Sequence, residues 1–256
     1  MSEVLLKAEG ITQQFGGLTA LNNVDFELRK NEIVGIIGPN GAGKTTFFNI
    51  ITGIYPPTAG TINYKGNNIT GKKTYEITSM GISRTFQNIR LFDQMTVLEN
   101  VMVGTHTHTN SGFLDAVFKT PRHHKTEKYV KEKAINLLEI TGLSEYRYHY
   151  STSLPYGFQR RLEIARAMAN SPEVLLFDEP AAGMNENETR NLAQFITEIN
   201  AMGYTILLIE HDMRLVMRIC HRIYVLDHGT LIFQGTPEEV KRDPKVIEAY
   251  LGQEVE

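Results

Sequence analysis

A glycine-rich segment near the N-terminus has the residue types and the spacing of a loop that binds polyphosphate. It matches the pattern G-x-x-x-x-G-K-[ST] and directly follows an apolar run at residues 33–37. Glycines let backbone amides approach an anion closely, and the N-terminal end of a following helix attracts negative charge. We expect Lys44 to bridge the β and γ phosphates of a nucleotide and the Thr45 hydroxyl to coordinate Mg²⁺. The predicted nucleotide-binding residues of this segment are Gly38, Pro39, Asn40, Gly41, Ala42, Gly43, Lys44, Thr45 and Thr46.

Two adjacent carboxylates, Asp178 and Glu179, follow a second apolar run at residues 174–177. If that run is a strand of a parallel sheet, both carboxylates lie at the carboxyl edge, where such sheets bind their ligands. We expect Asp178 to hold Mg²⁺ through water and Glu179 to polarise the water that attacks the γ-phosphate. The pair therefore favours hydrolysis of a nucleoside triphosphate.

Hydrophobic periodicity predicts the elements that must position these residues. Residues 24–28 alternate between apolar and polar side chains, and residues 33–37 are typical of a strand covered on both faces. Residues 88–171 have helical spacing, and Gly142 is well placed to end one of the helices. From residue 172 onward, strands and helices alternate, which predicts right-handed crossovers and a parallel sheet.

We therefore predict one α/β domain spanning residues 1–256, built on a P-loop NTPase core. Residues 1–87 and 172–236 form the nucleotide-binding core and include an N-terminal antiparallel β subdomain, whereas residues 88–171 form an inserted α-helical subdomain. Residues 222–234 are predicted to form a hairpin, and Pro237 and Pro244 are placed to begin two helices in the C-terminal segment 237–256.

Composition excludes several classes of protein. With 256 residues, 41% hydrophobic and 21% charged, the chain has ordinary globular usage. No apolar run approaches the roughly 20 residues of a membrane-spanning helix, and the N-terminus lacks the pattern of a secretory signal. The single cysteine, Cys220, excludes an internal disulfide, so we expect a reducing compartment. A net charge of −3 gives no sign of a basic face for nucleic acid, and we predict no nucleic-acid partner.

The order of the motifs resembles that of the ATP-binding subunits of ABC transporters over nearly the whole chain. Between the phosphate loop and the acidic strand, residues 154–162 are similar to the family's signature, which is usually written L-S-G-G-Q. The resemblance implies a cassette of the ABC ATPase type that binds ATP and Mg²⁺. It also implies that Tyr156 and Gly157 contact ATP held by a second ATPase subunit.

The resemblance assigns roles to three further residues. Gln87, in the segment R-T-F-Q, corresponds to the family's Q-loop and is expected to touch Mg²⁺ and to relay its state to the membrane subunit. His211, in the segment I-E-H-D, corresponds to the switch residue that contacts the γ-phosphate. Phe15 fits the aromatic residue that stacks on adenine. Glu179, His211 and Gln87 are thus the catalytic residues that we predict, and Thr45, Gln87 and Asp178 are the predicted metal-binding residues.

Four positions depart from the family pattern. Pro155, Tyr156 and Phe158 replace the usual serine, glycine and glutamine of the signature, and Asn185 replaces the usual aspartate of the D-loop. Proline offers neither a hydroxyl nor a backbone N–H to a phosphate, although it suits the first turn of a helix. We therefore expect a weakened but working half-site, whose asymmetry depends on the partner subunit.

Within the family, the chain resembles the ATPases of branched-chain amino acid importers most, on residues 81–92, 95–101, 179–185 and 235–252 and on a polar insert at about 105–125. The resemblance implies head-to-tail closure with a second ATPase, identical or paralogous, driven by ATP. It also implies transmembrane permease subunits, indirectly a solute-binding protein, and a peripheral location on the cytoplasmic face of the inner (cell) membrane.

Alternative functions remain at this stage. A urea or amide importer would carry a very similar ATPase subunit. A soluble ABC ATPase acting on DNA or ribosomes usually has two ATPase units or a long coiled-coil insertion, and neither is present. A signalling GTPase would need a guanine-reading N-K-x-D segment, which is absent. A small-molecule kinase would need neither a signature helix nor the pair formed by Glu179 and His211.

Overall fold

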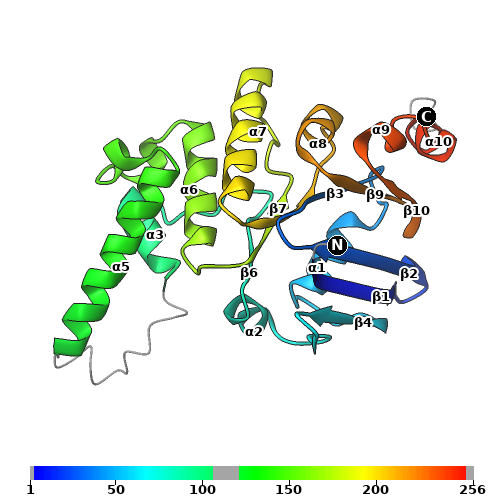
Figure 1. Cartoon of the computed structure of the whole chain (residues 1–256), viewed down its shortest axis with the longest axis horizontal. Helices are drawn as coiled ribbons and strands as arrows, with labels where there is room; N and C mark the ends of the chain where they lie inside the picture. The colour runs from blue at the N-terminus through cyan, green and yellow to red at the C-terminus, as the bar shows by residue number, and fades with distance from the viewer. Residues whose placement is uncertain (1–2, 106–120, 252–256) are drawn as a thin grey trace. The chain divides into compact units, whose positions relative to one another are not determined.

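The computed structural model describes residues 3–105 and 121–251, and these belong to two compact units. Met1–Gln87 and Glu173–Glu256 make up the first unit, and Asn88–Pro172 make up the second. Figure 1 shows the elements in chain order. Most of the polar insert expected at 105–125 lies outside the described residues. In the part of the chain that the structure describes, no helix has the length and apolar character needed to span a membrane.

A six-stranded sheet forms the centre of the first unit, in the order β10-β9-β3-β8-β7-β6. All neighbouring strands pair in parallel except β10, which is antiparallel to β9. Every residue of β3, β7 and β8 is buried, which explains why these strands are apolar runs in the sequence. The strands are β3 (Ile33–Ile37), β6 (Ile82–Arg84), β7 (Val174–Asp178), β8 (Thr205–Ile209), β9 (Arg222–Asp227) and β10 (Thr230–Gly235).

The pairing register of the three central strands sets the position of their carboxyl ends. Ile36 of β3 lies opposite Ile209 of β8, and Ile209 lies opposite Asp178 of β7. The loops that follow these strands therefore leave the sheet at the same edge. The sequence segments from Gly38, from Glu179 and from Glu210 meet there.

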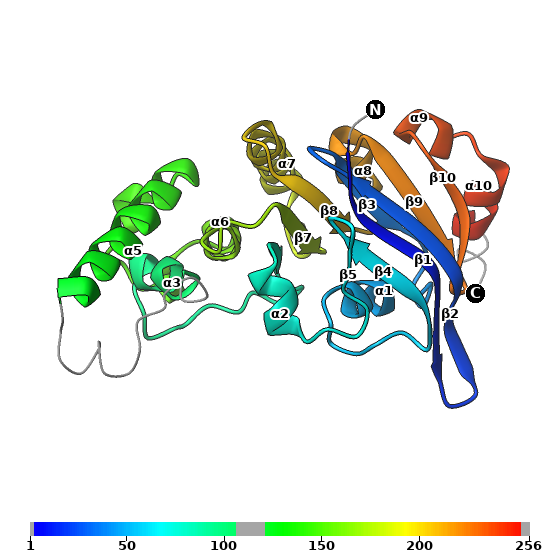
Figure 2. The same cartoon turned by 60° about the horizontal axis from the view of Figure 1, so that its bottom comes forward.

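A smaller antiparallel sheet lies on one face of the central sheet, and Figure 2 shows its long strands beside β3 and β9. Its strands are β1 (Val4–Phe15), β2 (Leu18–Arg29), β4 (Ala59–Tyr64) and β5 (Asn67–Asn68). Helix α1 (Lys44–Ile51) contributes Phe47 and Phe48 to a hydrophobic core that both sheets share. This core holds the start of α1, and thus the phosphate loop, against the sheet.

Helices α7 (Glu186–Ala201) and α8 (Met213–Ile219) lie on the opposite face of the central sheet (Figure 1). Helix α7 buries Leu192, Phe195, Ile196 and Ile199, the spacing of an amphipathic helix. Shorter helices complete the unit: α2 (Thr74–Ser79), α9 (Pro237–Val240) and α10 (Pro244–Leu251). The last two begin at the prolines from which the sequence predicted them.

The second unit is helical. Its elements are α3 (Val97–Val103), α5 (Pro121–Ile140), α6 (Tyr156–Met168) and two 3₁₀ turns at Ser144–Tyr146 and Ser151–Ser153. Helix α5 ends at Ile140, and Gly142 adopts a φ of 71°, which favours glycine after a helix end. The helices pack through buried side chains that include Val130, Leu137, Leu138 and Leu162.

A buried ion pair lies within α6. Arg160 Nη1 is 2.7 Å from Glu163 Oε2, and the two side chains are only 0% and 1% exposed. A cation held in an apolar interior is tolerated only because a carboxylate compensates its charge. The pair therefore balances the two opposite charges that α6 buries.

We predict that Arg160→Met lowers the free energy of unfolding by about 3–5 kcal/mol, because it removes the cation that directly contacts the buried Glu163 carboxylate. The matched control is Arg190→Met, which removes an exposed pair: Arg190 Nη2 is 3.5 Å from Glu186 Oε1, and the side chains are 57% and 69% exposed. That change costs about 1 kcal/mol at most. Urea unfolding of both variants measures the difference, and equal losses would contradict this account of the pair.

Candidate functional site

The phosphate loop joins β3 to α1 and depends on glycines at its turns. Gly41 and Gly43 have φ angles of 80° and 98°, in the left-handed region that other residues adopt at a cost. A Cβ atom on Gly43 would lie 2.6 Å from the Ala20 carbonyl oxygen, so no larger residue fits there. The loop therefore has the tight turn that lets backbone amides face an anion.

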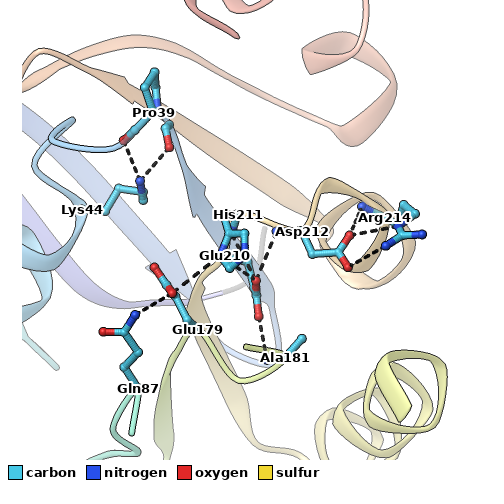
Figure 3. Close-up of polar contacts among 10 residues, drawn as sticks. Pro39, Lys44, Gln87, Glu179, Ala181, Glu210, His211, Asp212 and Arg214 are labelled. Carbon is cyan, nitrogen blue, oxygen red and sulfur yellow. Dashed lines mark hydrogen bonds and ion pairs between the residues drawn. The ribbon is translucent and has the colours of Figure 1, made fainter. Parts of the chain in front are cut away.

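The Lys44 ammonium lies inside this loop. Its Nζ donates hydrogen bonds to the carbonyl oxygens of Gly38 and Pro39, at 2.6 and 2.8 Å (Figure 3). Burial lowers the pKa of Lys44, and the negative charge of Glu179 partly opposes that shift. The side chain is thus a desolvated cation at the sheet edge that interacts electrostatically with Glu179. The next hydroxyl, that of exposed Thr45, forms no hydrogen bond with any described residue.

The two carboxylates after β7 have different partners. Asp178 is buried, and its Oδ2 accepts a hydrogen bond of 2.6 Å from Arg84 Nη2. Glu179 follows with a φ of 44°, a left-handed conformation that is uncommon for a residue with a side chain. The Glu179 carboxylate contacts residues of the Q-loop and the switch segment.

The structure brings the three predicted catalytic residues together. Gln87 Nε2 donates a 2.8 Å hydrogen bond to Glu179 Oε2, and His211 Nδ1 lies 3.6 Å from the same oxygen (Figure 3). These residues come from positions up to 124 apart in the sequence, following β6, β7 and β8 respectively. One carboxylate oxygen is thus shared by an amide and an imidazole, beside Lys44.

Glu210 is a buried residue of this cluster to which no role was assigned from the sequence. Its side chain is fully buried, and it accepts hydrogen bonds from the backbone amides of Ala181, His211 and Asp212 at 2.8, 3.1 and 3.2 Å. Burial raises the pKa of Glu210, while the bonds from those amides lower it. The residue connects the loop after Glu179 to the switch segment. A carboxylate at the end of an apolar run, a pattern that Glu210 shares with Asp178, is the sequence signal that could have found it.

Phe15 belongs to the first unit, and the signature residues belong to the second. Phe15 ends β1, is 46% exposed, and stacks edge-on against Tyr55 with ring centroids 5.5 Å apart. Tyr156 and Gly157 belong to the other unit, in the first turn of α6, where Pro155 occupies the N-cap position. Tyr156 is 40% exposed, and a Cβ atom on Gly157 would meet nothing within 4 Å. The first turn of α6 is therefore accessible.

Asn185 has a structural task in this chain. As the N-cap of α7, it accepts hydrogen bonds from the amides of Asn187 and Glu188, both at 3.0 Å. Glu188 completes a capping box through its bond to the Asn185 amide. An asparagine caps a helix as well as an aspartate does, so the replacement keeps the local structure while removing a charge.

The donor set at the sheet edge fits a magnesium ion that is held together with a nucleotide. Within the described ranges, no three His, Cys, Asp or Glu residues are grouped as a metal cage. Asp178 Oδ1 accepts no hydrogen bond from a described residue, and the Thr45 hydroxyl is likewise available. Mg²⁺ is commonly bound by one or two protein oxygens plus substrate phosphates and water. Thr45, Asp178 and Gln87 therefore offer suitable donors.

Comparisons with known proteins identify the family of this chain. A model of the ABC transporter family matches residues 21–182, and a model described as branched-chain amino acid ATP-binding cassette transporter matches residues 230–256. The chain is 50% identical, over 254 residues, to the high-affinity branched-chain amino acid transport ATP-binding protein LivG of Salmonella typhimurium. That alignment covers 99% of this chain and 100% of the relative.

Two solved structures resemble this one closely. An ATP-binding cassette of an ABC transporter in its ADP conformation has a TM-score of 0.86 and 34% identity, covering 98% of this chain and 100% of that chain. A dimeric ATP-binding cassette in a post-hydrolysis state, bound to ADP and Pi, has a TM-score of 0.74 and 26% identity, covering 91% and 99%. With a family match over more than half of its length and a full-length relative at 50% identity, the chain belongs to the ABC transporter family of ATP-binding cassettes.

Proposed function

We propose that this chain is the ATP-hydrolysing subunit of an importer for branched-chain amino acids. The full-length identity to LivG and the C-terminal match at residues 230–256 support this solute class. The site itself contacts no solute, because the transported molecule is selected by other polypeptides. A urea or amide importer would present the same ATP site, and no observation in this chain favours it.

The arrangement around Glu179 carries the proposal of hydrolysis. As a carboxylate that accepts a hydrogen bond from Gln87 and lies beside His211, Glu179 is a base positioned at the edge where the phosphate loop begins. Lys44 would hold the β and γ phosphates, and His211 would contact the γ-phosphate. Glu179 would then take a proton from the attacking water, and Gln87 would keep its carboxylate oriented.

Magnesium would be held by the Thr45 hydroxyl, by Asp178 through water and by Gln87. When bound with ATP it neutralises charge on the triphosphate. At the other end of the nucleotide, Phe15 would stack on adenine, supported by the ring of Tyr55.

The accessible first turn of α6 supports a composite site formed by two ATPase subunits. Tyr156 and Gly157 of one subunit would contact ATP held by the phosphate loop of the other, through the Gly157 amide and the N-terminal end of the helix dipole. Because Pro155 has no N–H to offer, this half-site is weaker than one with serine. The second subunit is a copy of this chain or a paralogue. Nucleotide bound between two subunits stabilises the closed dimer, and hydrolysis reopens it.

The permease subunits would contact the chain at residues 88–92, directly after Gln87. In the second unit, Asn100 is fully buried and holds the end of that segment: Phe92 donates its amide to Asn100 Oδ1 at 2.9 Å, and Asn100 Nδ2 donates to the Phe92 carbonyl at 3.1 Å. Phe92 itself is 45% exposed. Through its contact with the permease, the chain would bind peripherally at the cytoplasmic face of the inner membrane. The permease would receive solute from a solute-binding protein.

We predict that Glu179→Gln leaves ATP binding intact, slows hydrolysis by about 10²–10⁴-fold and accumulates an ATP-bound dimer. The amide keeps the shape of the side chain but takes no proton. Steady-state ATPase assays, equilibrium nucleotide binding and size-exclusion chromatography with ATP measure the three effects. Glu186→Gln, on the exposed first turn of α7, is the control and retains turnover. Near-normal ATP turnover by the Glu179→Gln variant would refute the role of Glu179 as the general base.

We predict that Glu210→Gln lowers kcat about tenfold with little change in nucleotide affinity. A glutamine has one acceptor oxygen where Glu210 uses two, so its NH₂ group would face a backbone amide. A tenfold fall in kcat corresponds to a rise of about 1.4 kcal/mol in the activation free energy of hydrolysis. The control Glu239→Gln alters a capping box of α9 and retains kcat. A wild-type kcat for Glu210→Gln would show that Glu210 is not needed to position His211.

A further inference from the structure

Arg84, the last residue of β6, is the cation closest to the predicted magnesium ligand Asp178. The guanidinium and carboxylate are 10% and 8% exposed, and Nη2 and Oδ2 are 2.6 Å apart. Parallel pairing of β6 with β7 places Arg84 opposite Leu176, two residues before Asp178. The contact is therefore fixed by the sheet itself.

The other amino group of Arg84 binds the helix that follows the phosphate loop. Nη1 donates to Asn49 Oδ1 at 2.9 Å and to Thr52 Oγ1 at 3.0 Å, both in or directly after α1. The rings of Phe48 and Phe86 lie 5.6 and 5.8 Å from the guanidinium carbon. A planar fork that is held at both amino groups and by two rings has one orientation, which a lysine ammonium does not reproduce.

The two carboxylate oxygens of Asp178 therefore have different surroundings. Oδ2 is occupied by Arg84, whereas Oδ1 accepts no hydrogen bond from any residue in the described ranges. A carboxylate anchored through one oxygen keeps its other oxygen in a fixed direction. Outer-shell partners of this kind orient metal ligands and change metal affinity by 10–100-fold in other proteins.

We propose that Arg84 is a positioning residue for magnesium: it holds Asp178 through Oδ2, so that Oδ1 is presented to the water shell of a Mg²⁺ bound with ATP. This inference rests on the proposed function, which places Mg²⁺ between Asp178 and the nucleotide. Without Arg84, the Asp178 carboxylate would lose the contact that fixes its orientation, and we expect its affinity for the hydrated cation to fall for that reason.

The test is the Mg²⁺ dependence of nucleotide binding, measured with a fluorescent, non-hydrolysable ATP analogue in EDTA and across a Mg²⁺ titration. For Arg84→Met we expect the half-maximal Mg²⁺ concentration to rise about tenfold or more, while affinity for the analogue in EDTA stays within about twofold. Arg84→Lys should show a smaller rise, because an ammonium can still donate one hydrogen bond to Asp178 Oδ2 although the planar fork is lost. In the Asp178→Asn background, adding Arg84→Met should cause no further change.

The matched control is Arg222→Met. Arg222 also forms a partly buried pair, with Glu32 at 2.9 Å, but at the amino ends of β9 and β3, and it should leave the Mg²⁺ titration unchanged. A wild-type Mg²⁺ midpoint in Arg84→Met, or equal losses of affinity in EDTA and in Mg²⁺, would overturn the inference. If Arg84→Met does not fold, a wild-type midpoint in Arg84→Lys overturns it. A wild-type chain that binds the analogue with no Mg²⁺ dependence would instead refute the proposed metal site.

Discussion

The register of three parallel strands is the constraint on which the site depends. Ile36, Ile209 and Asp178 lie across from one another in β3, β8 and β7, so the loops after these strands begin at one level of the sheet. Side chains on these three short strands are buried on both faces of the sheet, and a shift along a strand would draw the polar residues beyond its ends into the apolar interior. The phosphate loop, the acidic pair and the switch segment meet as a consequence of packing.

Such a site brings charges to the edge of an apolar interior, and each charge has a specific compensation. Carbonyl oxygens of the phosphate loop hold Lys44, Arg84 compensates Asp178, and backbone amides hold the buried Glu210. Glu179 is the most accessible of the three carboxylates, with a side chain that is 20% exposed. The carboxylate proposed as the base is therefore also the one that water reaches most readily.

Much of this organisation was predictable from the sequence, because it is encoded locally. Buried strands are apolar runs, glycines mark the phosphate loop, and Pro237 and Pro244 begin helices where expected. The pairing of Arg84 with Asp178 was not predictable, since it joins residues 94 apart and follows from β6 lying next to β7. Strand order depends on the whole chain. The N-cap role of Asn185 was not predicted either, because in the sequence this residue stood out only as a replacement for the usual D-loop aspartate.

The two units divide the proposed chemistry: Lys44 and Glu179 belong to one, and Gly157 belongs to the other. If the signature turn of a second subunit completes the ATP site, hydrolysis requires that two ATPase subunits associate. The most direct test is the ATPase rate per subunit over a wide range of concentrations of the chain, alone and mixed with a sister ATPase. The account predicts a rate per subunit that rises with concentration and then saturates; a constant rate under both conditions would contradict it.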